Sequence, residues 1–363
     1  MDLLIIISQA LLYLSFSVLV GGFILLLVPN EYRPDIKFPK RLLFICAIML
    51  PVYAFVPVLD IVLFLAPRLG FLDSLKIVLT TYTAGTAWDF TLLGSLLLVF
   101  LIAFTKSTEK VSFAYLGTFL TFGSILTVAW SSHAGALDQN IGIISDFIHL
   151  VAVSIWVGIL LIVGCFSTNH NNWLTFLSWF SWVAFGCLVA TALSGLFMMD
   201  VIMDGYIDSW MVSYGQGILV KHLFLLPLLF YALVNGFIVK YKISKDATFN
   251  PIPWIRLESF ILFAIFTITA IYSQQPPPHG NFLTNDAVSP LFRLFHDDII
   301  DAGNTIGFAI NLNTICFFFI SIFFFVLMVI SYFKKASIIF SFFFSCLFVT
   351  SIYLMLMVTV IIR

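Results

Sequence analysis

Charged residues are scarce in this sequence. Only 10% of its 363 residues are Asp, Glu, Lys or Arg, and the formal net charge is −1. No run of Lys and Arg forms the basic stripe with which nucleic-acid-binding proteins meet phosphates. The composition therefore excludes nucleic acid as the expected partner.

Cysteine is also rare, and its spacing excludes two further classes of protein. The sequence has no CxxC pair, and its five thiols all fall inside or at the edge of apolar segments: Cys46, Cys165, Cys187, Cys316 and Cys346. A disulfide framework or a zinc site would need paired spacing. We interpret these thiols as packing groups.

Long apolar runs dominate the sequence instead. Hydrophobic residues make up 61% of the chain, and the mean hydropathy is +1.10. Ten segments have about the length that spans a bilayer, at approximately 3–29, 42–66, 86–105, 112–130, 141–166, 173–203, 216–239, 254–273, 309–333 and 337–361. Because lipid offers no hydrogen-bond partners, each segment should be a helix. The predicted fold class is all-α, a polytopic transmembrane helical bundle.

Basic residues between the segments predict the orientation. They concentrate in the odd-numbered connections, at Arg33, Lys37, Lys40, Arg41, Lys106, Lys110, Lys240, Lys242, Lys245, Lys334 and Lys335. Cytoplasmic loops carry this excess, so both termini are expected outside. The first apolar run has no basic region before it and no small-residue cleavage site after it, which favours a retained span over a signal peptide.

The longest connection divides the chain into three predicted parts. Residues 1–275 form an eight-helix membrane domain, and residues 309–363 form a two-helix transmembrane appendage. Between them, residues 276–308 form an extracytoplasmic connection that opens with Pro276-Pro277-Pro278-His279. Apolar and charged residues alternate over 291–301, which predicts a short amphipathic helix there.

A carboxylate and an imidazole occur together inside the fifth apolar segment. Asp146 and His149 are three residues apart, so they share a helix face, and Trp156 continues the same stripe. At about 1.5 Å per residue, His149 lies roughly 12 Å below the start of its segment. Ionisable groups at such depth are functional candidates by default.

Other polar and sulfur-bearing groups are predicted in the same outer layer of the membrane. The imidazoles are His133, His149 and His222, the thioethers are Met198, Met199 and Met203, and the accompanying charged groups are Asp60, Asp146, Asp200 and Lys221. Imidazole together with thioether suits copper in both of its common oxidation states. Zinc would be expected to recruit cysteine or a denser set of His and carboxylates.

Several patches resemble the copper resistance D (CopD) family. One runs from Asp146 through His149 to Trp156-Val157-Gly158, preceded by His133-Ala134-Gly135-Ala136, and the others are Ser194-Gly195-Leu196, Tyr214-Gly215, Leu219, Lys221 and Asn235. The resemblance covers residues 1–275 and implies a multi-pass plasma-membrane protein that takes up or handles copper. It also implies an extracytoplasmic copper-binding partner. Ile159 replaces the family's usual second glycine, and the sequence has no fused soluble domain.

The main hypothesis is a copper importer rather than an enzyme. Copper would be met by His133 and the Met/Asp end of the sixth segment, and would pass to His149 and His222. Asp146 would orient His149 by accepting its second ring N–H, while Trp156 and Gly158 would allow close helix packing.

Two alternatives remain open at this point. His149 and His222 could be axial ligands of a haem in a membrane redox protein, with quinone chemistry following. The protein could also deliver copper to another membrane protein, as an assembly factor that transports nothing itself.

Overall fold

The structure, a computed structural model, describes residues 2–37, 39–105, 110–169, 171–246, 249–280, 283–301, 303–334 and 336–363. Within these residues, ten helices are long and apolar enough to cross a membrane, which confirms the predicted polytopic all-α bundle. Span seven differs most from its expected bounds. It runs over Ser213–Lys245 because a π-helical stretch, Val234–Val239, continues α9 (Ser213–Leu233) into α10 (Lys240–Lys245).

The predicted orientation is not tested by the fold and stays a prediction. Two of the loop lysines on which it depends, Lys106 and Lys335, lie outside the described residues. The chain packs into two compact units, which differ in outline from the three parts expected from the sequence. That three-part division also stays a prediction.

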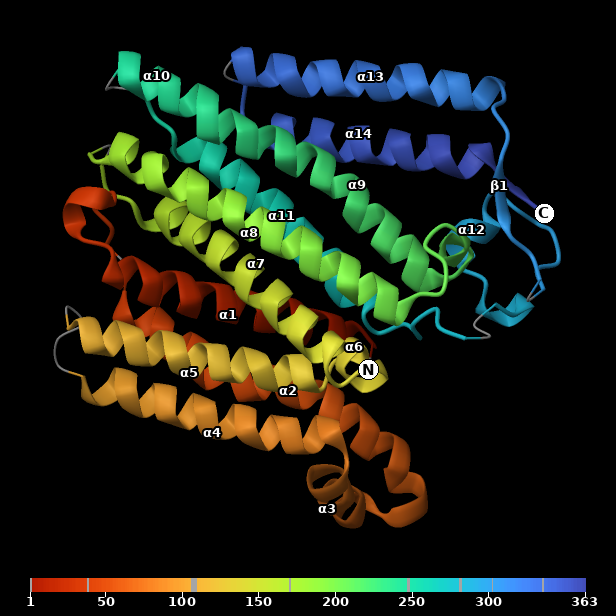
Figure 1. The fold of residues 1–363 in the computed structure, drawn as a ribbon, viewed down its shortest axis with the longest axis horizontal. Coiled ribbons are helices and arrows are strands. Elements are labelled where there is room, and N and C mark those ends of the chain that lie inside the picture. The colour runs from red at the N-terminus through yellow and green to blue at the C-terminus, as the bar shows by residue number, and fades with distance from the viewer. Residues whose placement is uncertain are drawn as a thin grey trace. The chain divides into compact units, whose positions relative to one another are not determined.

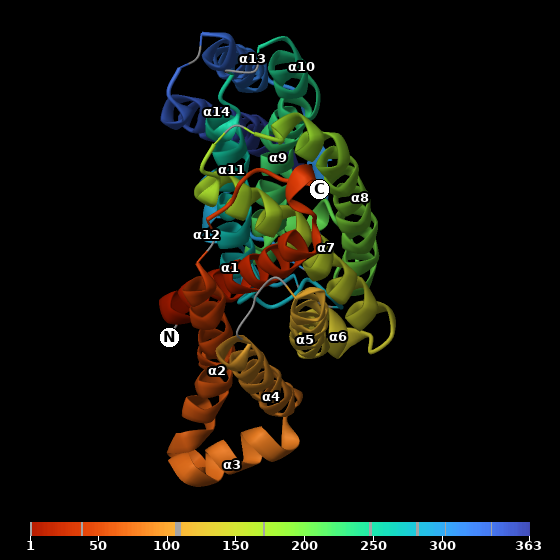
Figure 2. The same cartoon turned by 90° about the vertical axis from the view of Figure 1, so that its left-hand side faces the viewer.

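Unit 1 comprises Met1–Val201 and Gly236–Arg256. Its elements are α1 (Asp2–Leu27), η1 (Asn30–Tyr32), α2 (Lys40–Leu69), α3 (Phe71–Thr81), α4 (Thr83–Phe104), α5 (Val111–Trp130), α6 (His133–Leu137), α7 (Ile141–Phe166), α8 (Trp173–Ile202) up to Val201, the end of the π-helical stretch with α10, and the first turn of α11 (Ile252–Tyr272). Figure 2 shows α3 lying across the ends of α2 and α4.

Small residues bring α1 and α7 into close contact in unit 1. A Cβ atom added to Gly158 would overlap the carbonyl oxygen of Ser17, and one added to Gly21 would overlap the backbone of Gly158. In membranes, such close backbone approach is a main source of helix association. The structure thus confirms that Gly158 permits close packing, and it identifies α1 as the helix that uses it.

Proline in α2 is compensated by a side chain of α4. Pro51 lacks an N–H, so the carbonyl of Ala47 has no helical donor one turn earlier. Ser95 supplies one, with its Oγ 2.6 Å from that carbonyl oxygen. The Trp88 indole also donates to the Pro51 carbonyl, at 2.8 Å. The carbonyl that Pro51 leaves without a helical donor is therefore satisfied inside the protein, as an apolar surrounding demands.

Unit 2 comprises Ile202–Asn235 and Leu257–Arg363. Its elements are η2 (Asp208–Met211), α9, the remainder of α11, η4 (Asn285–Ala287), α12 (Pro290–Arg293), β1 (Ile306–Phe308), α13 (Leu312–Phe333), α14 (Ile338–Thr359) and β2 (Val360–Ile362). Antiparallel pairing joins β1 to β2, and α13 lies beside α14 (Figure 1). The amphipathic helix expected over 291–301 is one turn long, because α12 ends at Arg293.

The last helix is integrated into the packing of unit 2. Tyr353 of α14 donates to the side-chain oxygen of Gln216 on α9, and Ser345 of α14 donates to the Tyr231 hydroxyl at 3.5 Å. These contacts connect the predicted appendage to the start and to the end of α9.

Candidate functional site

His149 on α7 reaches across to α8. Its Nδ1 lies 3.2 Å from the carbonyl oxygen of Thr191 and 3.3 Å from the hydroxyl oxygen of Ser194. A carbonyl oxygen only accepts, so the imidazole donates from Nδ1 to Thr191. In a neutral ring the unprotonated nitrogen is then Nε2, which is the atom a metal ion would bind.

Two of the resemblance motifs therefore meet in space. Ser194 and Gly195 belong to one motif and His149 to the other, and a Cβ atom at Gly195 would lie 3.6 Å from the His149 ring carbon Cε1. Met198 and Met199 follow Ser194 and Gly195 by four residues, which places them one turn further along the same face of α8. On α8, Met198 thus lies one turn beyond Ser194 and Met199 one turn beyond Gly195, the two residues that meet His149 of α7.

The carboxylates predicted near His149 differ in exposure. Asp146 is buried, with 7% of its surface accessible, whereas Asp60 on α2 is half-buried and Asp200 at the end of α8 is exposed. Trp156 is buried on α7. The described contacts of His149 Nδ1 are with α8, so the orienting role of Asp146 stays a prediction.

His133 begins the short helix α6. The hydroxyl of Ser132 caps this helix by accepting the N–H of Gly135, at 3.2 Å. The His133 residue is exposed in unit 1. A position at the surface is compatible with the predicted role of meeting copper before the buried groups do.

The remaining predicted ligands lie in unit 2. His222 on α9 is half-buried, and its Nδ1 is 2.8 Å from the hydroxyl oxygen of Tyr206. The ammonium of its neighbour Lys221 donates to the hydroxyl of Tyr272, at 3.3 Å, and lies 5.9 Å from the centre of that ring. The described partner of Lys221 is therefore a phenol.

Met203 is buried just after α8, in the loop that leads to α9. The Ser209 hydroxyl lies 3.9 Å from its sulfur and also donates to the Tyr206 carbonyl, at 2.6 Å. Of the six predicted copper ligands, His133, His149, Met198 and Met199 thus belong to unit 1, and His222 and Met203 to unit 2.

Sequence reasoning missed an imidazole–carboxylate contact in unit 2. His279 Nδ1 lies 3.4 Å from an oxygen of Asp204, and the other oxygen of Asp204 accepts the N–H of Gly280. The triple proline placed His279 at the start of a connection, but no local signal linked it to a residue about 75 positions earlier. Tyr206 was missed for the same reason, since its role depends on how its loop folds back onto α9.

The ligand types present limit the chemistry of the site. Among the described residues, no group of three or more His, Cys, Asp or Glu could hold a metal ion. A binding site built from these residues would need thioether or backbone ligands beside the imidazoles. Copper accepts such a mixture more readily than zinc does.

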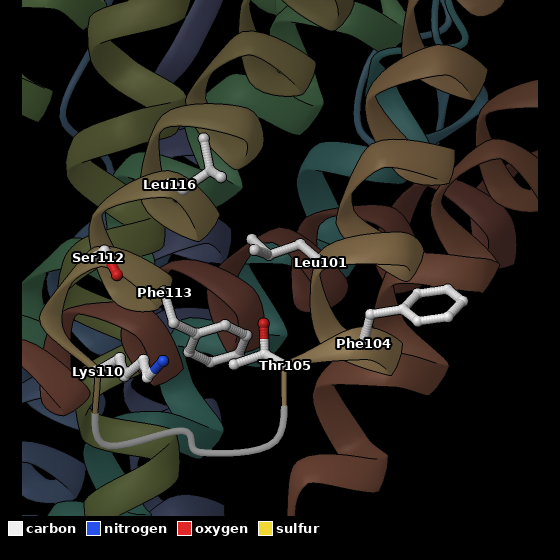
Figure 3. Close-up of a pocket in the computed structure, with 7 residues that line it drawn as sticks. All are labelled: Leu101, Phe104, Thr105, Lys110, Ser112, Phe113 and Leu116. Atoms are coloured by element: carbon white, nitrogen blue, oxygen red, sulfur yellow. The ribbon is translucent and has the colours of Figure 1, made fainter.

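A cavity of about 410 Å³ lies at the adjoining ends of α4 and α5, away from all of these residues in the sequence. Figure 3 shows its lining, which consists of Leu101, Phe104, Thr105, Lys110, Ser112, Phe113 and Leu116. This lining contains no imidazole, thioether or carboxylate. We therefore do not assign copper to the cavity.

Comparison with known proteins gives matches over most of the chain. The family description "copper resistance protein D" matches residues 174–272, and "copper resistance protein D-like, N-terminal domain" matches residues 1–143. A relative is the copper transport protein CutJ of Bacillus subtilis (strain 168), which is 28% identical over 165 residues. That alignment covers 43% of this chain and 30% of the relative. No solved structure matches.

Proposed function

Because the chain belongs to the copper resistance protein D family, we propose that it imports copper ions across the plasma membrane. The ligands in this proposal are His133, His149, Met198 and Met199 of unit 1 and His222 and Met203 of unit 2. Copper is the cargo, bound and released without covalent chemistry. Asp60, Asp146, Asp200, Lys221 and Trp156 accompany the ligands as pathway or supporting residues.

The hydrogen bonds that hold the His149 ring against α8 are the observation that supports this proposal most. An imidazole inside a membrane-spanning helix is expensive unless a partner satisfies it. Thr191 and Ser194 provide that partner at Nδ1, and copper-binding histidines are held in the same way through their second nitrogen. The match of residues 174–272 to the copper resistance family covers Ser194, Gly195 and both methionines of α8.

The relative's name supports transport over simple delivery. CutJ is described as a copper transport protein. The aligned part of this chain covers only 30% of that relative. A partner protein is therefore part of the proposal. We propose that an extracytoplasmic copper-binding protein delivers copper to the exposed His133.

Replacing His149 tests the proposal. Uptake of isotopic copper into proteoliposomes should fall at least about tenfold in His149→Ala. Loss of a residue that only supports a metal ligand typically costs about 10- to 100-fold, and loss of the ligand itself should cost no less. Ile148→Ala is the matched control, since Ile148 is adjacent on α7 and 42% exposed. Uptake equal to that of wild type in His149→Ala would refute the assignment. Copper binding without flux in wild type would identify a delivery factor.

A further inference from the structure

Tyr206 holds the imidazole of His222 from outside the membrane-spanning part of the chain. His222 is the tenth residue of α9, about 14 Å along the helix from Ser213. Tyr206 precedes that helix, in the loop that follows α8, yet its hydroxyl oxygen lies 2.8 Å from His222 Nδ1. The two ring centres are 5.4 Å apart.

The loop that carries Tyr206 is fixed on the start of α9. The backbone of Gly215 comes so close to the Ser209 carbonyl that a Cβ atom there would overlap it. The side-chain amide of Gln216 donates to the Trp210 carbonyl, and the Ser209 hydroxyl donates to the carbonyl of Tyr206 itself. These contacts fix the backbone position from which the Tyr206 side chain extends.

The ring of Tyr206 is also held in place. The indole of Trp210 packs edge-on against it, with ring centres 5.8 Å apart. Trp210 is buried, and Met211 beside it is completely buried. The phenol therefore approaches His222 from a rigid support, so the hydrogen bond does not require a flexible side chain to be ordered.

This contact determines which nitrogen of His222 can bind a metal ion. Nδ1 is occupied by the phenol, so copper has to bind at Nε2, and the ring proton then resides on Nδ1. A hydroxyl can donate to Nδ1 before loading and accept from it afterwards. Where the phenol donates to Nδ1, the ring proton is on Nε2, and copper binding at Nε2 then moves this proton to Nδ1 without loss of a proton.

We propose that Tyr206 is a positioning residue that directs copper to Nε2 of His222. The inference rests on the proposed function, because it takes His222 as a copper ligand. It adds a residue that the sequence patterns did not indicate, and it explains why a loop outside the membrane packs so closely on α9. Partners that fix the second nitrogen of a ligating histidine typically contribute 10- to 100-fold to metal affinity.

Tyr206→Phe tests the inference, since it removes the hydroxyl and keeps the ring that packs on Trp210. Purified full-length protein is titrated with Cu(II) ions against a competing chelator. We expect affinity to fall about 10- to 100-fold in Tyr206→Phe and to fall further in His222→Ala. Tyr115→Phe, at a position 64% exposed on α5, should bind as wild type does.

A spectroscopic measurement separates positioning from simple structural support. In pulsed electron paramagnetic resonance of the Cu(II)-loaded protein, the remote imidazole nitrogen reports its own hydrogen bond. The component lost in His222→Ala should change in Tyr206→Phe. Weakened affinity with an unchanged remote-nitrogen signal would overturn the inference, because the phenol would then act only through folding.

The outcomes also distinguish this inference from the proposed function. If His222→Ala loses copper while Tyr206→Phe binds like wild type, the positioning role is wrong and the import proposal stands. If His222→Ala binds like wild type, His222 is not a ligand and the inference fails with it. Import itself is judged separately, by the flux measured in His149→Ala.

Discussion

At the scale of single residues, the environment of His149 depends on a helix that is distant in sequence. Thr191 and Ser194 provide its hydrogen-bond partners, and Gly195 leaves room for the ring. The sequence pattern indicated that His149 mattered, through its depth in an apolar segment. It could not identify Thr191, whose contribution is a backbone carbonyl that every residue type possesses.

Enlarging Gly195 should displace the imidazole. A Cβ atom there would lie 3.6 Å from His149 Cε1, an ordinary contact, so Gly195→Ala should keep copper uptake near that of wild type. Gly195→Val adds two further methyl groups to this space and should reduce uptake severalfold by moving the ring off Thr191. Uptake in proteoliposomes checks both variants. Equal uptake in Gly195→Val would show that the ring position does not matter.

His296 gives unit 2 a pH dependence outside the membrane-spanning segments. Burial lowers the pKa of His296 below its ordinary value of 6.5, although the Met357 carbonyl and Asp298 favour the charged form. The unfolded chain therefore binds more protons than the folded one just below that value. The folded state of unit 2 therefore has its full stability above about pH 6.5 and becomes less stable as the pH falls below that value.

Thermal unfolding in detergent tests this pH dependence. The unfolding temperature of wild type should decline as pH is lowered from about 7 to 5, and His296→Gln should decline less steeply. Burial of the ring is what disfavours its protonated form, because His296 Nε2 can donate to the Met357 carbonyl, 3.2 Å away, in either protonation state. Parallel curves for the two proteins would contradict the assignment.

At the scale of elements, small residues determine how helices meet. Gly158 of α7 lies against Ser17 and Gly21 of α1, where a Cβ atom would overlap backbone atoms. Backbone atoms cannot rotate away as a flexible side chain can, so any larger residue has to push the helices apart. This contact was expected from the Trp156-Val157-Gly158 pattern, but its partner helix was not.

Gly158→Ala should destabilise the protein by about 1–3 kcal/mol, the usual cost of overpacking. Gly186→Ala on α8 is the matched control, because nothing lies within 4 Å of a Cβ atom there. Alanine favours helix over glycine, so this control should be neutral or slightly stabilising. Unfolding temperatures in detergent compare the two, and an unchanged value for Gly158→Ala would show that α1 and α7 can separate without cost.

Hydrophobicity predicted the elements better than it predicted their connections. All ten spans follow from apolar length, because lipid leaves the helix as the simplest way to satisfy a backbone. The continuation of the span through Val234–Val239 was missed, since a π-helix has no clear compositional signal. The amphipathic helix near residue 291 was predicted too long because alternating polarity there also suits an irregular loop.

At the scale of the whole molecule, the predicted ligands are distributed over two compact units. His149 and Met198 belong to one unit and His222 and Met203 to the other. Depth in the membrane can be read from a sequence, since it is counted along each span. Distances between helices cannot, because many bundles satisfy the same pattern of apolar segments.

The last two helices also show that the sequence of one segment does not reveal which helices it packs against. α13 and α14 contain no charged residue, which suggested an appendage. The hydrogen bonds of Tyr353 and Ser345 instead connect α14 to Gln216 and Tyr231 of α9. Tyrosine and serine are common in spans, so only the packed structure identifies these contacts.

Inward flux of isotopic copper into sealed proteoliposomes tests the central claim most directly. Import that depends on His149 predicts accumulation with wild type and with Ile148→Ala, and accumulation at least about tenfold lower with His149→Ala. Copper that binds wild type without entering the vesicles, or that enters equally well with His149→Ala, would contradict this account.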